Sequence, residues 1–102
     1  MSHDQIKQKV AEALANSPYQ KAIQKVSLFG SHLHQNQKSG SDIDLLIEFS
    51  PDAVIGFFQL SRIQRALEQY LQNEVDLLTP EALSPYFKND VLKEAFPLYE
   101  RQ

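Results

Sequence analysis

The sequence predicts a small α/β (α+β) domain in which helices pack against a mixed β-sheet. Three observations support this fold class: segments with the 3.6-residue period of amphipathic helices, apolar β-prone runs between them, and turn residues at the boundaries. The length of 102 residues fits a single domain over residues 1–102. We expect the order helix, strand, strand, helix, strand, helix.

The first helix is expected over residues 2–15. Ser2 and Gln5 have the spacing of a capping box, in which each side chain binds the backbone N–H of the other. The segment Asn16-Ser17-Pro18 ends the helical pattern. Apolar residues recur on one face of this helix: Ile6, Val10, Ala13 and Leu14.

Two further helices follow the same reasoning. Residues 57–71 have an apolar face at helical spacing, and residues 87–95 show a shorter one that ends before Pro97. The neighbouring Phe57 and Phe58 are assigned to the core. Phe87 and Phe96 are also assigned to the core, with a partner-facing patch as the alternative.

Three strands are expected between the helices, at residues 23–29, 43–49 and 75–78. Each is rich in Val, Ile, Leu or Phe, and each is followed by turn residues such as Gly30 or Pro51. Short strands separated by helices predict a small sheet covered by those helices.

Composition excludes several classes of protein. There is no cysteine, so disulfides, thiolate metal sites and thiol catalysis are excluded, and a reducing cytoplasm is the expected location. No apolar run approaches the roughly 20 residues of a membrane span, and the N-terminus lacks the pattern of a secretory signal. The net charge of −3 and the absence of a basic face argue against stable nucleic-acid binding.

The candidate chemistry lies in the second strand. Asp42 and Asp44 are two residues apart, so both point to the same face of a strand. Carboxylates without His or Cys favour a hard divalent cation, Mg²⁺ or Mn²⁺. Asp76, on the third strand, joins them if that strand lies alongside, and it is then either a metal ligand or a general base.

The turn after the first strand supplies a candidate anion site. Gly30 permits close approach of the backbone to a ligand, and Ser31 adds a hydroxyl donor. Lys38 and Ser41, which lie between the two strands, complete the predicted nucleotide-binding set, and a solvated loop charge is the alternative for Lys38. The pattern predicts that a phosphate binds beside the carboxylates.

Gly30-Ser31, Asp42-Ile43-Asp44 and the later Asp76 together resemble the DNA polymerase β-like nucleotidyltransferase superfamily. Within it, the chain is similar to the minimal nucleotidyltransferases (MNT proteins), which act as antitoxins beside HEPN-domain toxins. The resemblance covers about residues 20–101 and includes the runs 41–49 and 75–83.

This resemblance implies a palm-like nucleotidyltransferase fold, ATP as substrate, Mg²⁺ as cofactor, and transfer of AMP to a HEPN-type partner, whose tyrosine is the acceptor. It assigns Gly30 and Ser31 to phosphate binding, Asp42 and Asp44 to metal binding, and Asp76 to the third carboxylate. The family segment after Gly-Ser is often rich in Arg and Gly, whereas here it carries two histidines, His32 and His34, and Lys38.

Other functions stay open at this stage. Loss of the arginines favours a nucleotide-binding module that neutralises its partner by stoichiometric contact rather than by catalysis. A regulatory nucleotide sensor is a third alternative. The acceptor, the preference among nucleoside triphosphates and the homo- or hetero-oligomeric state do not follow from the sequence.

Overall fold

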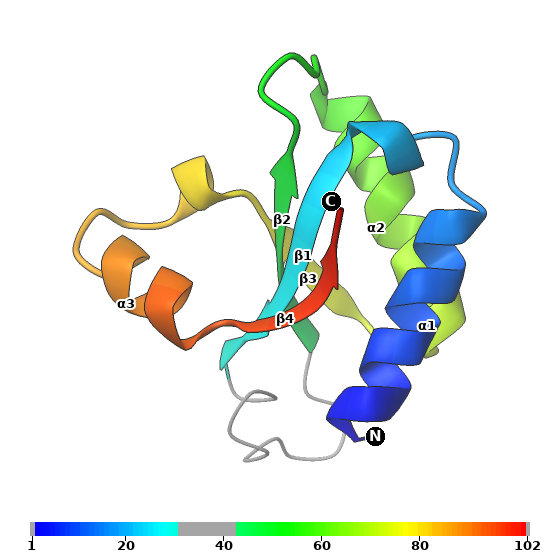
Figure 1. Cartoon of the computed structure of the whole chain (residues 1–102), viewed down its shortest axis with the longest axis horizontal. Coiled ribbons are helices and arrows are strands. Elements are labelled where there is room, and N and C mark those ends of the chain that lie inside the picture. The colour runs from blue at the N-terminus through cyan, green and yellow to red at the C-terminus, as the bar shows by residue number, and fades with distance from the viewer. Residues whose placement is uncertain (1, 31–42, 102) are drawn as a thin grey trace.

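The computed structural model describes residues 2–30 and 43–101 of the chain (Figure 1). The elements follow in the order α1 (His3–Ala15), η1 (Gln20–Ala22), β1 (Ile23–Phe29), β2 (Ile43–Phe49), α2 (Phe57–Leu71), β3 (Val75–Leu78), η3 (Pro80–Ala82), α3 (Lys88–Glu94) and β4 (Phe96–Glu100). The bounds of the three expected strands and of the helix at 57–71 are confirmed.

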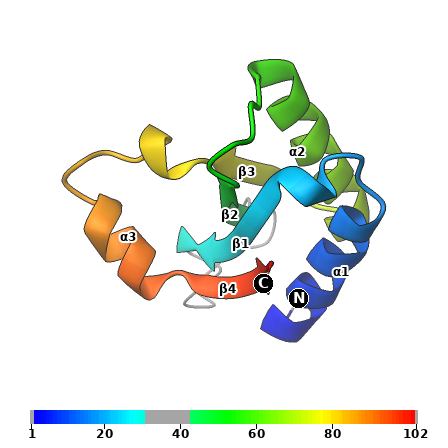
Figure 2. The same ribbon diagram turned by 45° about the horizontal axis from the view of Figure 1, so that its top comes forward.

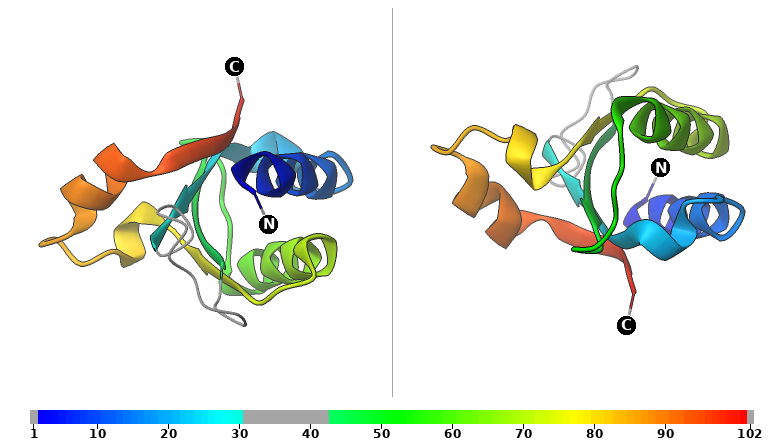
Figure 3. Two further views of the ribbon diagram at one scale, coloured as in Figure 1. Left: turned by 90° about the horizontal axis from the view of Figure 1, so that it is seen from below. Right: turned by 90° about the horizontal axis from the view of Figure 1, so that it is seen from above.

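The strands form one mixed sheet in the order β3-β2-β1-β4. β1 runs antiparallel to both β2 and β4, while β2 and β3 are parallel, as expected for strands joined by a helical crossover. α1 and α2 lie together on one side of this sheet, and η3 and α3 lie on the other (Figure 3). The predicted fold class, a small mixed sheet with helices packed against it, is confirmed.

α1 begins with the capping box that the sequence predicts. The N–H of Gln5 donates to Oγ of Ser2 at 3.1 Å, and the N–H of Ser2 donates to Oε1 of Gln5 at 2.8 Å. Both bonds satisfy backbone donors that have no partner within the helix. The C-cap of the helix is Asn16, whose side-chain amide donates to the hydroxyl of Tyr70 on α2 at 3.0 Å.

The N-cap of α2 is Gly56, whose N–H donates to Oε1 of Gln59 at 3.0 Å. Its C-cap is Gln72, which adopts the left-handed conformation at φ 52°.

No helix in residues 2–30 and 43–101 combines the length and the apolar character of a bilayer-crossing segment. Figure 2 shows α1 and α2 side by side, each with one face toward the sheet.

A single apolar core lies between the two long helices and the sheet. It combines the predicted faces of α1 and α2 with alternate residues of the strands, as expected when one face of a sheet is covered by helices. Its fully buried members include Ile6, Val10, Leu14, Ile23, Val26, Leu28, Ile43, Leu45, Ile47, Leu67 and Leu71.

The C-terminal part differs from the sequence prediction. The last helix is limited to Lys88–Glu94, and residues Phe96–Glu100 form a fourth strand, β4, that was not predicted. β4 pairs with β1 alone and is therefore an edge strand, where a proline such as Pro97 is tolerated because one side of the strand needs no N–H donor.

The assignment of four phenylalanines to the core is wrong. Phe57 and Phe58 are 76% and 77% exposed, and Phe87 is 63% exposed. The first turn of α2 lies beside an open pocket rather than over the sheet, and α3 lies on the side of the sheet away from the core. Phe96 is 37% exposed at the sheet edge, where the centroids of its ring and of the His3 ring are 5.0 Å apart.

Candidate functional site

Asp44 on β2 and Asp76 on β3 are register partners in the parallel pair. Their flanking residues Ile43 and Val75 are also partners and are buried in the core, so both aspartates lie on the opposite face of the sheet. Neighbouring strands are about 4.8 Å apart, which brings the two carboxylates side by side. Asp44 is half-buried and Asp76 is exposed.

Gly30 follows β1 directly beside this pair. Phe29 is the register partner of Asp44, and Gly30 has a φ of +76°, in the left-handed region that favours glycine. A Cβ atom at position 30 would overlap Oδ2 of Asp44 and lie 3.0 Å from its Cγ. The backbone at Gly30 therefore approaches the Asp44 carboxylate more closely than any other residue type would permit.

The donors brought together here suit a hard divalent cation. Two carboxylates directly opposite each other on adjacent strands repel, and a cation between them offsets this repulsion. Carboxylate oxygens are the ligands that Mg²⁺ and Mn²⁺ prefer. Within residues 2–30 and 43–101, no group of three His, Cys, Asp or Glu side chains is placed to hold a metal ion, so the described donors are Asp44 and Asp76.

Several predicted site residues lie outside the described residues. Their assigned roles in nucleotide and metal binding stay predictions: Ser31, Lys38, Ser41 and Asp42. Of the predicted set, the structure brings together Gly30, Asp44 and Asp76, each from a different strand or strand end.

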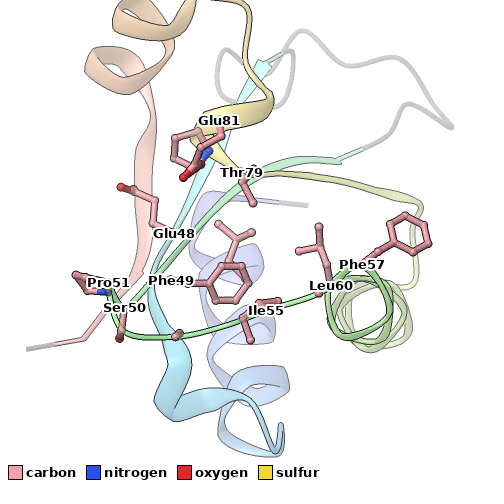
Figure 4. A pocket seen from close by; sticks show the side chains of 13 residues that line it. Glu48, Phe49, Ser50, Pro51, Ile55, Phe57, Leu60, Thr79 and Glu81 are labelled. Carbon is pink, nitrogen blue, oxygen red and sulfur yellow. The ribbon is translucent and has the colours of Figure 1, made fainter.

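A pocket of about 530 Å³ lies at the other ends of β2 and β3 (Figure 4). It forms where β3 stops at Leu78 while β2 continues to Phe49, and the segments 50–57 and 79–81 enclose the space. Leu46, which is buried, lies between this pocket and Asp44 along β2. Sequence reasoning missed the pocket, although Pro80 just after a short strand signals that the strand cannot continue.

Comparison with known proteins gives one consistent family. Residues 8–102 match the family model described as "Polymerase beta, Nucleotidyltransferase". A curated protein of Methanocaldococcus jannaschii, named "Putative protein adenylyltransferase MJ0435", is 35% identical over 95 residues, which cover 93% of this chain and 96% of that protein.

Solved structures give the same fold. A structure described as a "putative minimal nucleotidyltransferase" is 27% identical, with a TM-score of 0.76, over 95% of this chain and 96% of the other. A Shewanella oneidensis complex of a tri-AMPylated HEPN toxin with an MNT antitoxin contains a chain that is 21% identical, with a TM-score of 0.67, over 98% of this chain and 74% of that one.

Proposed function

We propose that this chain, which belongs to the polymerase beta nucleotidyltransferase family, transfers AMP from ATP to a side chain of a partner protein. One observation carries the proposal: Asp44 and Asp76 are paired across parallel strands beside the left-handed Gly30. The similarity to proteins named protein adenylyltransferases supports a protein as the acceptor.

The reaction is the replacement of pyrophosphate by a hydroxyl group at the α-phosphorus of ATP. The oxygen of the acceptor hydroxyl forms a bond to that phosphorus, the bond from the phosphorus to the oxygen bridging to the β-phosphate breaks, and pyrophosphate leaves. The hydroxyl proton passes to a carboxylate of the site or to water. Asp76, the more exposed of the two described acids, is accessible to such a proton.

The acid pair would also hold the cation. Asp44 and Asp76, with Asp42 as the third predicted ligand, would bind Mg²⁺ or Mn²⁺. The positive charge of the cation would offset the negative charge of the triphosphate and of the departing pyrophosphate. Gly30, which leaves space beside Asp44, would let the backbone approach a phosphate without a side chain in between. Ser31, Lys38 and Ser41 complete the proposed nucleotide contacts.

The proposed partner is a HEPN-type toxin, which this chain would neutralise as the antitoxin by AMP transfer to a tyrosine. The similar Shewanella complex, which contains a tri-AMPylated HEPN toxin and an MNT antitoxin, supports this partner. Under this proposal the acceptor hydroxyl arrives on a separate protein.

The test follows the label from ATP. Label on the α-phosphate should appear on the partner protein, and label on the γ-phosphate should not. The variant Asp42→Asn/Asp44→Asn should lose transfer, while Asp52→Asn/Asp90→Asn, which removes the same charge from exposed positions, should keep it. Undiminished labelling by the first variant refutes the site assignment.

A second function, stoichiometric neutralisation without turnover, is favoured by the exposed aromatic side chains. Phe57, Phe58, Tyr86 and Phe87 are 63–91% exposed, and aromatic side chains are enriched at protein interfaces. If Asp42→Asn/Asp44→Asn protects cells from the toxin at the same dose as the natural chain, contact suffices and catalysis is not the protective step.

A further inference from the structure

The edge of β2 that faces β3 is only partly paired. β3 pairs with residues 43–46 of β2, and in the described part of the chain no strand pairs with Ile47–Phe49 on that side. The N–H of Ile43 donates to the carbonyl of Glu74 at 2.9 Å, which shows that Ile43 directs its backbone groups toward β3. By the alternation along a strand, Ile47 and Phe49 direct theirs toward the same side.

The proline at position 80 explains why the pairing stops. Continuing the parallel register from Leu46 and Leu78 would place Ile47 opposite Thr79, and the next N–H would come from residue 80. Pro80 has no N–H, and the chain turns into η3 at that residue. Ile47 and Phe49 both line the pocket described above, but Ile47 is fully buried at 0% exposed, so the accessible part of this edge lies at the half-buried Phe49.

The pocket is lined by apolar side chains together with two acidic ones. Phe49, Ile55 and Leu60 supply apolar surface, and Figure 4 shows Glu48 and Glu81 on the side opposite Ile55. None of the lining residues is basic. Charge complementarity therefore favours a cationic occupant with an apolar portion.

The two carboxylates have no competing partner in the part of the chain that the structure describes. Neither Glu48 nor Glu81 forms a side-chain hydrogen bond or an ion pair in residues 2–30 and 43–101. Lys25 is the register partner of Glu48 on β1, but it does not line the pocket. The acidic side of the pocket is thus available to a basic group from another molecule.

We propose that this pocket binds an extended segment of the acceptor protein, which adds to the open edge of β2 at Phe49. Backbone hydrogen bonds to Phe49 hold the segment, an apolar side chain fills the space beside Leu60, and a neighbouring Lys or Arg meets Glu48 and Glu81. The proposal rests on the proposed function for the identity of the partner as acceptor.

The position of the pocket suits this role. Glu48 lies four residues beyond Asp44 on the same face of β2, which corresponds to about 13 Å along the strand at about 3.3 Å per residue. A protein bound at Glu48 and Phe49 is close enough for another of its side chains to reach the Asp44–Asp76 pair. Holding the acceptor there lowers the entropic cost of the transfer step.

The test uses short acetylated peptides that alternate Leu with Arg, or Leu with Glu, and measures binding by fluorescence anisotropy without nucleotide. The Leu-Arg peptide should bind the natural chain roughly ten-fold or more tightly than the Leu-Glu peptide, and Glu48→Lys/Glu81→Lys should reverse the order. The control Glu12→Lys/Asp90→Lys makes the same charge change at exposed sites and should keep it. Absent binding of the Leu-Arg peptide, or equal binding of both peptides, overturns the proposal.

A second arm tests the backbone contacts and the rival occupant. N-methylation of alternate residues of the Leu-Arg peptide, on the edge that would face β2, should abolish binding, and unchanged binding rules out strand addition. Sedimentation of the protein alone tests a second copy as occupant: self-association that Ile55→Asp abolishes would overturn the proposal. Because no arm uses ATP, failure here leaves AMP transfer to be judged by its own labelling test.

Discussion

The carboxylate of Asp44 occupies the space that a Cβ atom of Gly30 would need. An added Cβ would overlap Oδ2 of Asp44, and the φ of +76° at Gly30 already disfavours every residue with a side chain. The position of Gly30, directly after β1, is therefore coupled to the position of Asp44 on β2. Any substitution at position 30 should move the acid pair as well as strain the backbone.

Gly30→Ala should reduce AMP transfer by more than it reduces stability. Alanine at a positive φ costs about 1 kcal/mol or more of unfolding free energy, and the overlap with Asp44 displaces its carboxylate from Asp76. Urea denaturation measures the first effect, and the rate of label transfer at a temperature where the variant is fully folded measures the second. Natural transfer rates in a folded Gly30→Ala protein would contradict the coupling.

The opposite substitution at a second left-handed residue should stabilise the protein. Gln72 ends α2 at φ 52°, a position that glycine adopts without strain. Gln72→Gly should raise the unfolding free energy by roughly 0.5–1 kcal/mol and leave AMP transfer unchanged, because Gln72 lies at the end of α2, outside the candidate site. A loss of stability in urea would show that the side chain of Gln72 contributes more than its backbone strain costs.

Cation binding at the acid pair should appear as thermal stabilisation. Mg²⁺ with a non-hydrolysable ATP analogue should raise the Tm of the natural chain, because a ligand that binds only the folded state stabilises it. In Asp44→Asn/Asp76→Asn this rise should shrink or vanish. The charge-matched Asp52→Asn/Asp90→Asn should retain it, and an equal rise in both double variants would place the cation elsewhere.

The exposed phenylalanines should be dispensable for folding. Phe57→Ser/Phe58→Ser should change the unfolding free energy by no more than about 0.5 kcal/mol per site, since both rings are more than three-quarters exposed at 76% and 77%. Leu67→Ala, in the fully buried face of the same helix, should cost about 2–5 kcal/mol. Comparable losses in the two variants would mean that the aromatic pair is buried in the folded protein.

Much of the fold follows from local patterns. The capping box at Ser2 and Gln5 and the alternation around Asp44 and Asp76 each act over a few residues, so the sequence alone predicts them. The sequence does not predict by itself that β2 pairs with β3, because this pairing depends on contacts between residues far apart in the chain. The convergence of Asp44 and Asp76 is therefore predicted only if the two strands are neighbours. The structure meets that condition.

The missed features depend on tertiary context. The five residues of β4 contain Pro97 and show no clear alternation, and only pairing with β1 makes them a strand. Phe57 has the spacing of a core residue but lies where β3 has already ended, so no sheet covers it. The pocket likewise arises from the difference in length between β2 and β3, which no single segment reveals.

The central claim is that the Asp44–Asp76 pair carries AMP transfer. The most direct measurement is the single-turnover rate of α-phosphate label transfer by Asp76→Asn, compared with Asp52→Asn under saturating ATP and Mg²⁺. We expect Asp76→Asn to be slower by about two orders of magnitude or more, whether Asp76 binds the cation or accepts the proton. A rate within roughly three-fold of that of Asp52→Asn, well below the effect of losing an acid–base group, would contradict the assignment.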